Sequence, residues 1–248
     1  MPRFLFTRRW IKLLVFALVV AGVCVRLGFW QLQRLHDLRV FNAAIEAGMN
    51  GPPVPIETVL PPGSSPDASI AVFRRVSATG TYDTAHEVIL YGRSLSNDQP
   101  GNHVLTPLRL ADGTAVIVDR GWVPLAMATA PVAEAAPPGG TVSVVGVLYA
   151  SEASSHGPPV TTFRQVDLPR LGAQLPYPIA PLYMKLQTQR PAQSGSLPTP
   201  EPPPPLDEGP HLDYAFQWFS FATIALLGYG LLAVKEARRL RPEAAAQA

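Results

Sequence analysis

FQWFSFATIALLGYGLLAV, the 19 residues from Phe216 to Val234, contains no charged side chain. As a helix this stretch would extend about 28 Å, close to the thickness of the hydrocarbon core of a bilayer. Four cations follow directly: Lys235, Arg238, Arg239 and Arg241. Cations beside a membrane span are typical of the cytoplasmic side. The sequence therefore predicts a transmembrane helix with its interfacial approach over residues 211–234, followed by a cytoplasmic basic tail over residues 235–248.

A second apolar block lies near the N-terminus. Residues 13–25 are uncharged, and Trp10 and Trp30 would stand about 30 Å apart at the two ends of a helix. The basic residues 1–9 before it again indicate the cytoplasmic side. A cleaved signal peptide is the alternative, but no small-x-small cleavage site follows the apolar stretch. We therefore predict a first transmembrane helix over residues 10–30, after a cytoplasmic basic N-terminus.

The segment between the two apolar blocks is acidic. From Leu27 to Asp213 it has 11 Lys and Arg against 16 Asp and Glu, whereas the whole chain has a formal net charge of +2. Only 15% of the residues are charged and 28 are Pro, a composition unlike that of an ordinary cytosolic globular protein. Because the segment lacks a basic excess, we expect it on the outer side of the membrane. An acidic domain also disfavours nucleic-acid binding.

The residues after the first span keep a helical pattern. Leucines recur at helical spacing from Leu32 to Leu38, and no helix breaker occurs before Gly48. The first helix is therefore expected to continue as an amphipathic stalk over residues 31–48. The next stretch, from Gly51 to Asp67, contains six prolines and is predicted to be a loop without a regular element.

An extended pattern then predicts a small, mostly antiparallel β domain within residues 49–195. Apolar and polar residues alternate cleanly over residues 104–110, and Ala111-Asp112-Gly113 is a hairpin turn signal. Several runs are apolar on both faces, which suggests strands covered by a helix or by the membrane surface. The predicted strands are 70–78, 86–91, 103–110, 115–122 and 141–149, with weaker runs at 163–166 and 182–186. The expected fold class is a membrane α+β protein, in which two transmembrane helices flank an extracytoplasmic β domain.

Residues 196–210 form a proline-rich tract with seven prolines and three acidic side chains. Such a tract favours extended polyproline II structure and acts as a semi-rigid spacer. We interpret it as a tether that returns the chain to the membrane. A PxxP ligand for a partner domain is the alternative.

Enzyme motifs are sparse. The chain has no GxSxG, GxxxxGK[ST] or HExxH motif, and its single cysteine, Cys24, lies within the first apolar block, where no base would activate it. The spacing of the histidines is not that of a metal site; they are His36, His86, His103, His156 and His211. We therefore expect neither an enzyme nor a protein metal site.

His211 is the residue that favours a binding function. A helix beginning there would place His211, Ala215 and Trp218 on one face, with Tyr214 beside them. A neutral imidazole at a membrane interface, backed by aromatic rings, is a candidate axial ligand for a haem iron. An interfacial histidine among the usual belt of aromatic residues is the alternative.

Four sequence blocks together resemble one protein family, in the family's order and at matching positions relative to the two predicted helices. They are Leu27–Arg34 (similar to LGxWQxxR), Gly101–Pro107 with Asp112-Gly113 (GxxVLTP and DG), Val118–Pro124 (VxRGWVP) and His211–Phe219 (HLxYAxQWF). On these blocks the chain resembles the SURF1 (Shy1-like) assembly factors of haem–copper terminal oxidases. One departure follows Arg34: where the family has an aromatic residue and a Lys, this chain has Leu35-His36-Asp37, and the next cation is Arg39.

The resemblance implies a non-catalytic role in the maturation of cytochrome c oxidase, through delivery or insertion of haem a into the catalytic subunit. It implies that His211 binds haem a. It also implies the oxidase catalytic subunit, other assembly factors and the lipid bilayer as partners. The other signature positions come without an assigned role: Gly28, Trp30, Gln31, Arg34, Pro107, Gly113, Arg120, Gly121, Trp122, Tyr214 and Trp218.

The block around Arg120 admits two interpretations. Its guanidinium would suit a haem propionate, because it can donate two parallel hydrogen bonds to a carboxylate. An ion pair with an acidic side chain inside the domain is the favoured alternative. Trp122 is expected in the core rather than as a haem-stacking face, and Gly121 at a bulge or turn near the strand end.

The alternative function is a purely structural membrane scaffold that holds oxidase subunits without binding cofactor. Carrying, insertion and stabilisation of haem are all compatible with the sequence. The absence of an amphipathic, Arg- and Ser-rich presequence favours a bacterial plasma membrane over a mitochondrial membrane.

Overall fold

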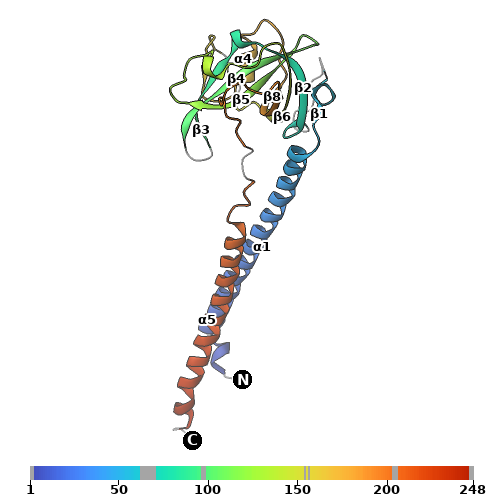
Figure 1. The fold of residues 1–248 in the computed structure, drawn as a ribbon. Helices are drawn as coiled ribbons and strands as arrows, with labels where there is room; N and C mark the ends of the chain where they lie inside the picture. The colour runs from blue at the N-terminus through green and yellow to red at the C-terminus, as the bar shows by residue number, and fades with distance from the viewer. Residues whose placement is uncertain are drawn as a thin grey trace. The chain divides into compact units, whose positions relative to one another are not determined.

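The chain folds into two compact units in a computed structural model that describes residues 3–61, 71–95, 99–153, 155, 157–202 and 206–245. Residues 1–43 and 206–248 form the helical unit, and residues 44–205 form the β unit. Figure 1 follows the chain from one unit to the other by colour.

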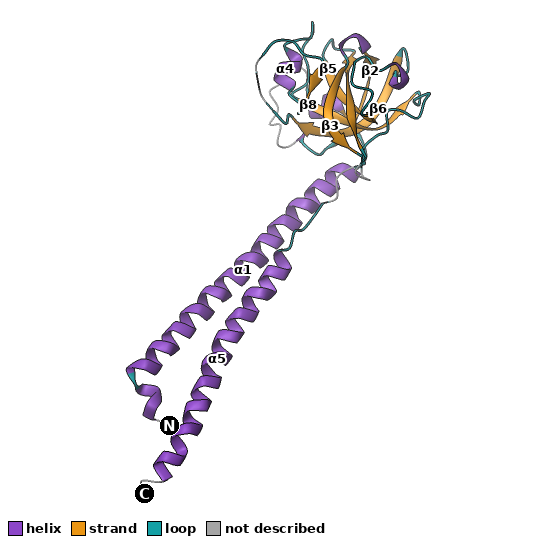
Figure 2. Ribbon diagram, turned by 90° about the vertical axis from the view of Figure 1, so that its left-hand side faces the viewer, coloured by secondary structure: helices purple, strands orange, loops and turns teal. Residues whose placement is uncertain are grey.

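Two long helices make up the helical unit. α1 (Arg8–Asn50) runs without a break through both the predicted span and the predicted stalk, and a short 3-10 helix, η1 (Arg3–Phe6), precedes it. α5 (His211–Ala245) contains the second predicted span. Both helices are long and apolar enough to cross a membrane. They lie side by side in both views of the chain (Figure 1, Figure 2).

The interface between α1 and α5 consists mainly of small residues. Contacts between the Trp10 and Tyr229 rings at one end, and between Phe29 and Phe219 further along, show that the helices are antiparallel. The buried positions recur at alternating spacings of four and three, as in a coiled coil. They are Ala17, Ala21, Cys24, Gly28, Gln31 and Leu35 on α1, and Ala215 and Ala222 on α5 with half-buried Trp218 between them. Small side chains at such positions let two helix backbones approach closely.

Five strands of the β unit close into a barrel. Around the ring they are β2 (Arg75–Tyr82), β6 (Thr141–Ala150), β8 (Leu182–Arg190), β5 (Ala115–Pro124) and β4 (Pro100–Leu110). The ring closes because β2 pairs with β4 as well as with β6. Within the ring only β5 and β8 are parallel, so the barrel is mostly antiparallel, as predicted. Outside it, β3 (Val88–Ser94) pairs with β4, and β7 (Thr162–Phe163) pairs with β3.

Both faces of the barrel wall are buried at β5. Val116 and Val118 point into the core cluster inside the ring, together with Leu108 and Met184. On the outer face, Ile117 packs against two leucines of α4 (Leu168–Gly172). A helix therefore covers this strand, which explains why its sequence is apolar on both faces.

The prediction of a loop without regular structure from Gly51 to Asp67 is wrong for residues 54–59. β1 (Val54–Pro55) pairs with β2, and α2 (Ile56–Val59) follows it. Ile56 is only 2% exposed and packs in the barrel core. The prolines do not prevent this helix, because three of them precede its first residue, where a backbone N–H is not needed, and the other three follow its end. Residues 62–70 lie outside the described part of the chain.

The first predicted strand begins later than expected. β2 starts at Arg75 because a turn precedes it, in which the Arg74 N–H donates to the Ala71 carbonyl and Phe73 has a φ of 64°. The other predicted strands correspond to β3 to β8, with β7 reduced to two residues and β8 extended to Arg190. The sequence analysis also missed the short helices α4, η2 (Thr84–His86) and η3 (Ala133–Ala135).

The first half of the proline-rich tract packs on the barrel. The backbone N–H groups of Trp122 and Thr199 donate to each other's carbonyls at 2.8 and 2.9 Å, so Thr199 pairs with β5. Glu201 binds Lys185 of β8 at 2.7 Å. The predicted spacer therefore contacts the barrel at Thr199 and Glu201, and its residues 203–205 lie outside the described part of the chain.

Candidate functional site

The first and last signature blocks meet in the helical unit. Nδ1 of His211, the first residue of α5, lies 2.8 Å from Oε1 of Gln31 on α1. Gln31 is buried and His211 is half-buried. An amide oxygen can only accept a hydrogen bond, so Nδ1 of His211 carries a hydrogen, and in the neutral imidazole Nε2 then has the lone pair. The contact therefore selects the tautomer that leaves Nε2 able to bind a metal.

The surroundings of His211 fit an axial ligand of haem iron. Metal-ligating histidines usually donate their second ring N–H to an acceptor that fixes the orientation of the ring, and Gln31 supplies that acceptor. A β-carbon at Gly209 would lie 3.6 Å from Nε2, so the glycine places no side chain beside that nitrogen. Within the described ranges, no group of three or more His, Cys, Asp or Glu side chains is placed to hold a metal ion. His211 would thus act as a single protein ligand.

The side of α5 that carries His211 faces α1, as the helical spacing predicts. Ala215 is 1% exposed, and Trp218 packs against the cluster formed by Ala21, Cys24 and Ala222. This packing fixes the first two turns of α5, so His211 is attached to a rigid element.

Three other signature residues lie on the surface of the helical unit. Trp30 and Tyr214 are about half exposed, and Arg34 is exposed without an ion-pair partner among the described residues. The structure therefore brings Gln31 to His211 and leaves these three side chains accessible.

Gly28 leaves room for the Phe219 ring in the packing of the two helices. A β-carbon at this position would lie 2.7 Å from two ring carbons of Phe219, closer than any real contact. Both residues belong to signature blocks, and they lie in the same interface as Gln31 and His211. Gly28 therefore allows α5 to approach α1 closely enough for the hydrogen bond to form.

An ion pair joins α1 to the residues just before α5. Arg39 donates from Nε and Nη2 to the two carboxylate oxygens of Glu208 at 2.9 and 2.8 Å. Asn42 donates to the carbonyl of Asp207 at 3.3 Å. The hydrogen bond from Arg39 lowers the pKa of Glu208 below its usual value. Arg39 is the first cation after the departure from the family signature, and its contact holds the segment that leads into His211.

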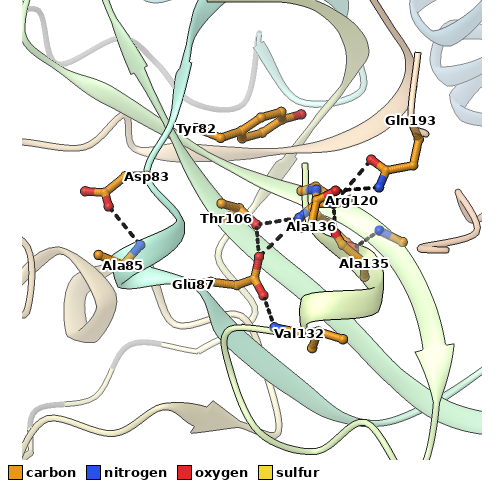
Figure 3. Close-up of polar contacts among 12 residues, drawn as sticks. Tyr82, Asp83, Ala85, Glu87, Thr106, Arg120, Val132, Ala135, Ala136 and Gln193 are labelled. Atoms are coloured by element: carbon orange, nitrogen blue, oxygen red, sulfur yellow. Dashed lines mark hydrogen bonds and ion pairs between the residues drawn. The ribbon is translucent and has the colours of Figure 1, made fainter. Parts of the chain in front are cut away.

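Arg120 lies in a buried polar network in the β unit (Figure 3). Its Nη1 donates to Glu87 Oε2 at 3.1 Å, and both side chains are 1% exposed or less. Glu87 also accepts from the Thr106 hydroxyl at 2.9 Å and from the Val132 backbone N–H at 2.8 Å. Burial lowers the pKa of Arg120, and the adjacent carboxylate of Glu87 opposes this effect. Of the two interpretations of Arg120, the structure contains the internal ion pair.

A β-bulge surrounds Arg120, at the place expected for Gly121. The register of β4 and β5 shifts so that Val104 faces Gly121 and Leu105 faces Asp119, which leaves Arg120 as the extra residue. Asp119 stabilises the bulge, because its carboxylate accepts from the Gly121 N–H at 3.1 Å and lies 2.9 Å from Nδ1 of buried His103.

Gly121 also allows the proline-rich tract to dock. Its φ is +119°, a conformation that favours glycine, and a β-carbon there would lie 2.2 Å from the Thr199 carbonyl oxygen. Trp122, beside it, is 7% exposed and belongs to the core, as expected. The RGW block therefore shapes the barrel wall.

The remaining signature positions also serve the barrel. Pro107 lies between the residues of β4 that pair with β3 and those that pair with β2, so its missing N–H interrupts neither ladder. Gly113 lies in the turn between β4 and β5 that the sequence predicts.

Comparison with known proteins agrees with these blocks. A sequence model of the SURF1 family matches residues 18–223. The chain belongs to the SURF1 family. Uncharacterized SURF1-like proteins of Mycobacterium bovis and Mycobacterium tuberculosis are each 34% identical to it, over 99% of this chain and 92% of their own length. A SURF1-like protein of Monosiga brevicollis is 26% identical over 90% of this chain and 88% of its own, and one of Rickettsia felis is 29% identical over 42% and 43%.

The sequence analysis did not identify the partners in three contacts of this SURF1 chain: Gln31 with His211, Arg39 with Glu208, and Glu87 with Arg120. Gln31 stands out in the sequence only as a signature position. Glu87 and Glu208 belong to no motif, and no signal in a single sequence pairs them with their distant partners. The signature therefore identified important positions of the SURF1 chain but not which of them meet.

Proposed function

We propose that this chain is a membrane-anchored assembly factor for cytochrome c oxidase that holds haem a at His211 during maturation of the catalytic subunit. In the proposed topology, both termini are cytoplasmic and the β unit lies outside a bacterial plasma membrane. Membership of the SURF1 family, two apolar helices and the acidic charge of the β unit support this proposal.

The hydrogen bond between His211 and Gln31 is the observation that carries the proposal. Gln31 orients the imidazole ring through Nδ1, so that in the neutral ring Nε2 has the lone pair, and Gly209 places no side chain beside that nitrogen. When bound, haem a would supply the redox-active group needed by the oxidase, and the chain itself performs no catalytic step in this proposal. The role of His211 is to bind the iron and release it to a partner.

The test is the visible spectrum of the full chain, purified after co-expression with the enzymes of haem a synthesis. We expect a haem a signal for the wild type and its loss in His211→Ala. His36→Ala is the matched control, because His36 is an exposed histidine on α1, and its haem content should equal that of the wild type. An unchanged haem load in His211→Ala would remove His211 from the mechanism.

Two variants of Gln31 test the role of the hydrogen bond. Gln31→Leu removes the acceptor and should weaken haem binding about 10- to 100-fold. Gln31→Glu keeps an acceptor at the same position and should restore most of the affinity. Equal haem titration curves for Gln31→Leu and the wild type would show that the contact serves only helix packing.

The third signature block favours a scaffold as the alternative function. Arg120, Gly121 and Trp122 shape the barrel wall of the β unit and are buried. A scaffold that holds oxidase subunits through this unit would co-purify with the oxidase without any haem a signal of its own. Loss of oxidase co-purification in His211→Ala would argue against it.

A further inference from the structure

The place where the barrel ring closes carries a row of polar side chains on its outer face. β2 pairs with β4 on one side and with β6 on the other, so Thr81 faces Arg109 across the first ladder and Thr141 across the second. Directly paired residues of antiparallel strands point to the same face of a sheet, with β-carbons about 5 Å apart. All three are exposed, whereas Tyr82 and Leu108 beside them are buried inside the ring. The pairing therefore brings the three exposed side chains together.

A cavity of about 640 Å³ lies over this row. Its walls come from β2, from the end of β4 with the following turn, from η2 and from the first residue of β6. The volume is that of a site for a small organic molecule. Besides Arg109, the polar side chains that line it are mainly threonines: Thr79, Thr81, Thr84 and Thr141. The cavity therefore suits a ligand with many polar groups.

The donors that line the cavity are free to bind a ligand. Within the described part of the chain, the guanidinium of Arg109 has no hydrogen-bond acceptor and no ion pair, and the four threonine hydroxyls have no partner. A guanidinium presents its N–H groups as a planar fork that matches two oxygens of an anion, and each hydroxyl can donate one more hydrogen bond. A ligand in the cavity thus meets an array of donors around one positive charge.

Tyr177 holds the side chain of Arg109 in place. The guanidinium carbon lies 5.1 Å from the centre of the Tyr177 ring, a contact that leaves the N–H groups available for hydrogen bonds. The Tyr177 hydroxyl in turn donates to Asp83 at 2.7 Å. Burial and this hydrogen bond raise the pKa of Tyr177, so the hydroxyl remains a donor. Arg109 is therefore oriented before a ligand binds, which reduces the entropy lost on binding.

The carboxylate in the cavity wall does not neutralise Arg109. Asp83 accepts from the Ala85 N–H at 3.1 Å and from Tyr177, and its second oxygen also lies 2.8 Å from Nδ1 of His86 (Figure 3 shows the contact with Ala85). Three donors therefore surround this carboxylate, and Arg109 is not one of them. The positive charge of Arg109 is available to an anion.

We propose that this cavity binds an organic phosphate, whose oxygens accept hydrogen bonds from Arg109, Thr81 and Thr141. A carboxylate has two oxygens, which the guanidinium alone would occupy, whereas a phosphate has a third for the hydroxyls on the two neighbouring strands. The other threonines face the organic part of the ligand, which is therefore polar. The phosphate belongs either to a soluble ester or to a lipid headgroup. The site lies wholly in the β unit, and the proposal does not depend on haem binding at His211.

The experiment is calorimetric titration of the full chain with glycerol phosphate, in a detergent and a buffer that contain no phosphate. Glycerol and glycerate are the control ligands, because they have the same carbon skeleton with no anion or with a carboxylate. We expect saturable binding of glycerol phosphate, weaker binding of glycerate and none of glycerol.

Two variants of Arg residues test the charge. Arg109→Gln should weaken binding of glycerol phosphate about tenfold or more, as expected for loss of a hydrogen bond to a charged group. Arg164→Gln is the matched control, because Arg164 is an exposed arginine of the β unit that does not line the cavity. It should bind glycerol phosphate like the wild type.

A third variant removes one hydroxyl without changing the shape of the side chain. Thr81→Val keeps a β-branched residue in β2 and should weaken binding about 2- to 10-fold. Thr162→Val, at an exposed position of β7, is its matched control and should have no effect. Displacement of glycerol phosphate by dihexanoyl phosphatidylglycerol would assign the phosphate to a lipid headgroup, and no displacement would assign it to a soluble ester.

Three results would overturn the proposal: no binding of glycerol phosphate to the wild type, equally tight binding of either control ligand, or equal affinities of Arg109→Gln and Arg164→Gln. The haem a signal of Arg109→Gln should equal that of the wild type, so failure of this proposal can be told from failure of the proposed function.

Discussion

Glu87 and Arg120 place a pair of opposite charges inside the barrel, where neither side chain is more than 1% exposed. Such a pair adds little net stability compared with apolar residues of the same volume, because both charges lose their hydration. Removing only one partner is costly, since the other charge stays buried without compensation. The pair therefore makes Glu87 as important as Arg120, although no motif contains it.

Glu87→Ala should lower the free energy of unfolding of the β unit by about 3–5 kcal/mol. Arg93→Ala is the matched control, because Arg93 forms an ion pair with Glu152 in which both side chains are about 30% exposed. That control should cost about 1 kcal/mol or less. Urea unfolding followed by near-UV circular dichroism measures both, and equal losses for the two variants would contradict the distinction.

The helix pair α1 and α5 depends on small residues and on the contact of Gly28 with Phe219. Gly28→Leu should overpack the interface and weaken it by about 1–3 kcal/mol. The rate of disulfide formation between native Cys24 and an introduced Ala222→Cys reports helix approach, because both positions share one buried cluster. We expect slower cross-linking in Gly28→Leu and recovery when Phe219→Ala is added. If Phe219→Ala does not restore the cross-linking rate, Gly28 does not act through its contact with Phe219.

The segment before α5 should respond to acid. Hydrogen bonding by Arg39 lowers the pKa of Glu208, although the negative charge of Asp207 opposes it. A lowered pKa in the folded state means that the contact is fully present above the ordinary Glu pKa of about 4.3 and is lost as the pH falls through the lowered value. Because both side chains are exposed, the effect is local and weakens with salt.

Hydrogen exchange of the Arg39 Nε–H, corrected for its intrinsic pH dependence, measures this loss, because Arg39 donates this proton to Glu208. We expect protection at about pH 6 that disappears near pH 3 in the wild type, and no such change in Glu208→Gln. Arg34→Gln is the matched control, because Arg34 is exposed and has no ion-pair partner among the described residues. It should titrate like the wild type.

For the molecule as a whole, the proposed topology predicts which residues face the outside of the cell. Cys24 is the only cysteine, so a Cys24→Ser background allows single labels to be introduced. In spheroplasts, a membrane-impermeant maleimide should label Glu134→Cys in the β unit at once and Lys235→Cys only after lysis. The reverse pattern would show that both termini lie outside.

The features predicted from sequence are those set by local patterns. The alternation at residues 104–110 and the turn at Asp112-Gly113 predict the hairpin of β4 and β5, and uncharged stretches predict the long helices. Helices of four or five residues, such as α2 and α4, are too short for a periodic signal. Closure of β2 on β4 and the parallel pairing of β5 with β8 join distant residues, which no local pattern encodes.

The same limit applies to the candidate site. Position relative to the second span and family resemblance identified His211. Its partner Gln31 is 180 residues away, and only the packing of α5 on α1 brings the two together.

The order of strands around the barrel determines how early during synthesis the ring can close. β8 is the last strand to be made, yet it joins β6 to β5, so the ring cannot close before residue 190 is available. His211 follows about twenty residues later, which is a delay of only a few seconds on a ribosome that adds about 5–20 residues each second. The barrel can therefore begin its non-local ring closure only shortly before α5 is made. Substitutions that delay ring closure should thus reduce the yield of newly made protein before they change the stability of the finished one.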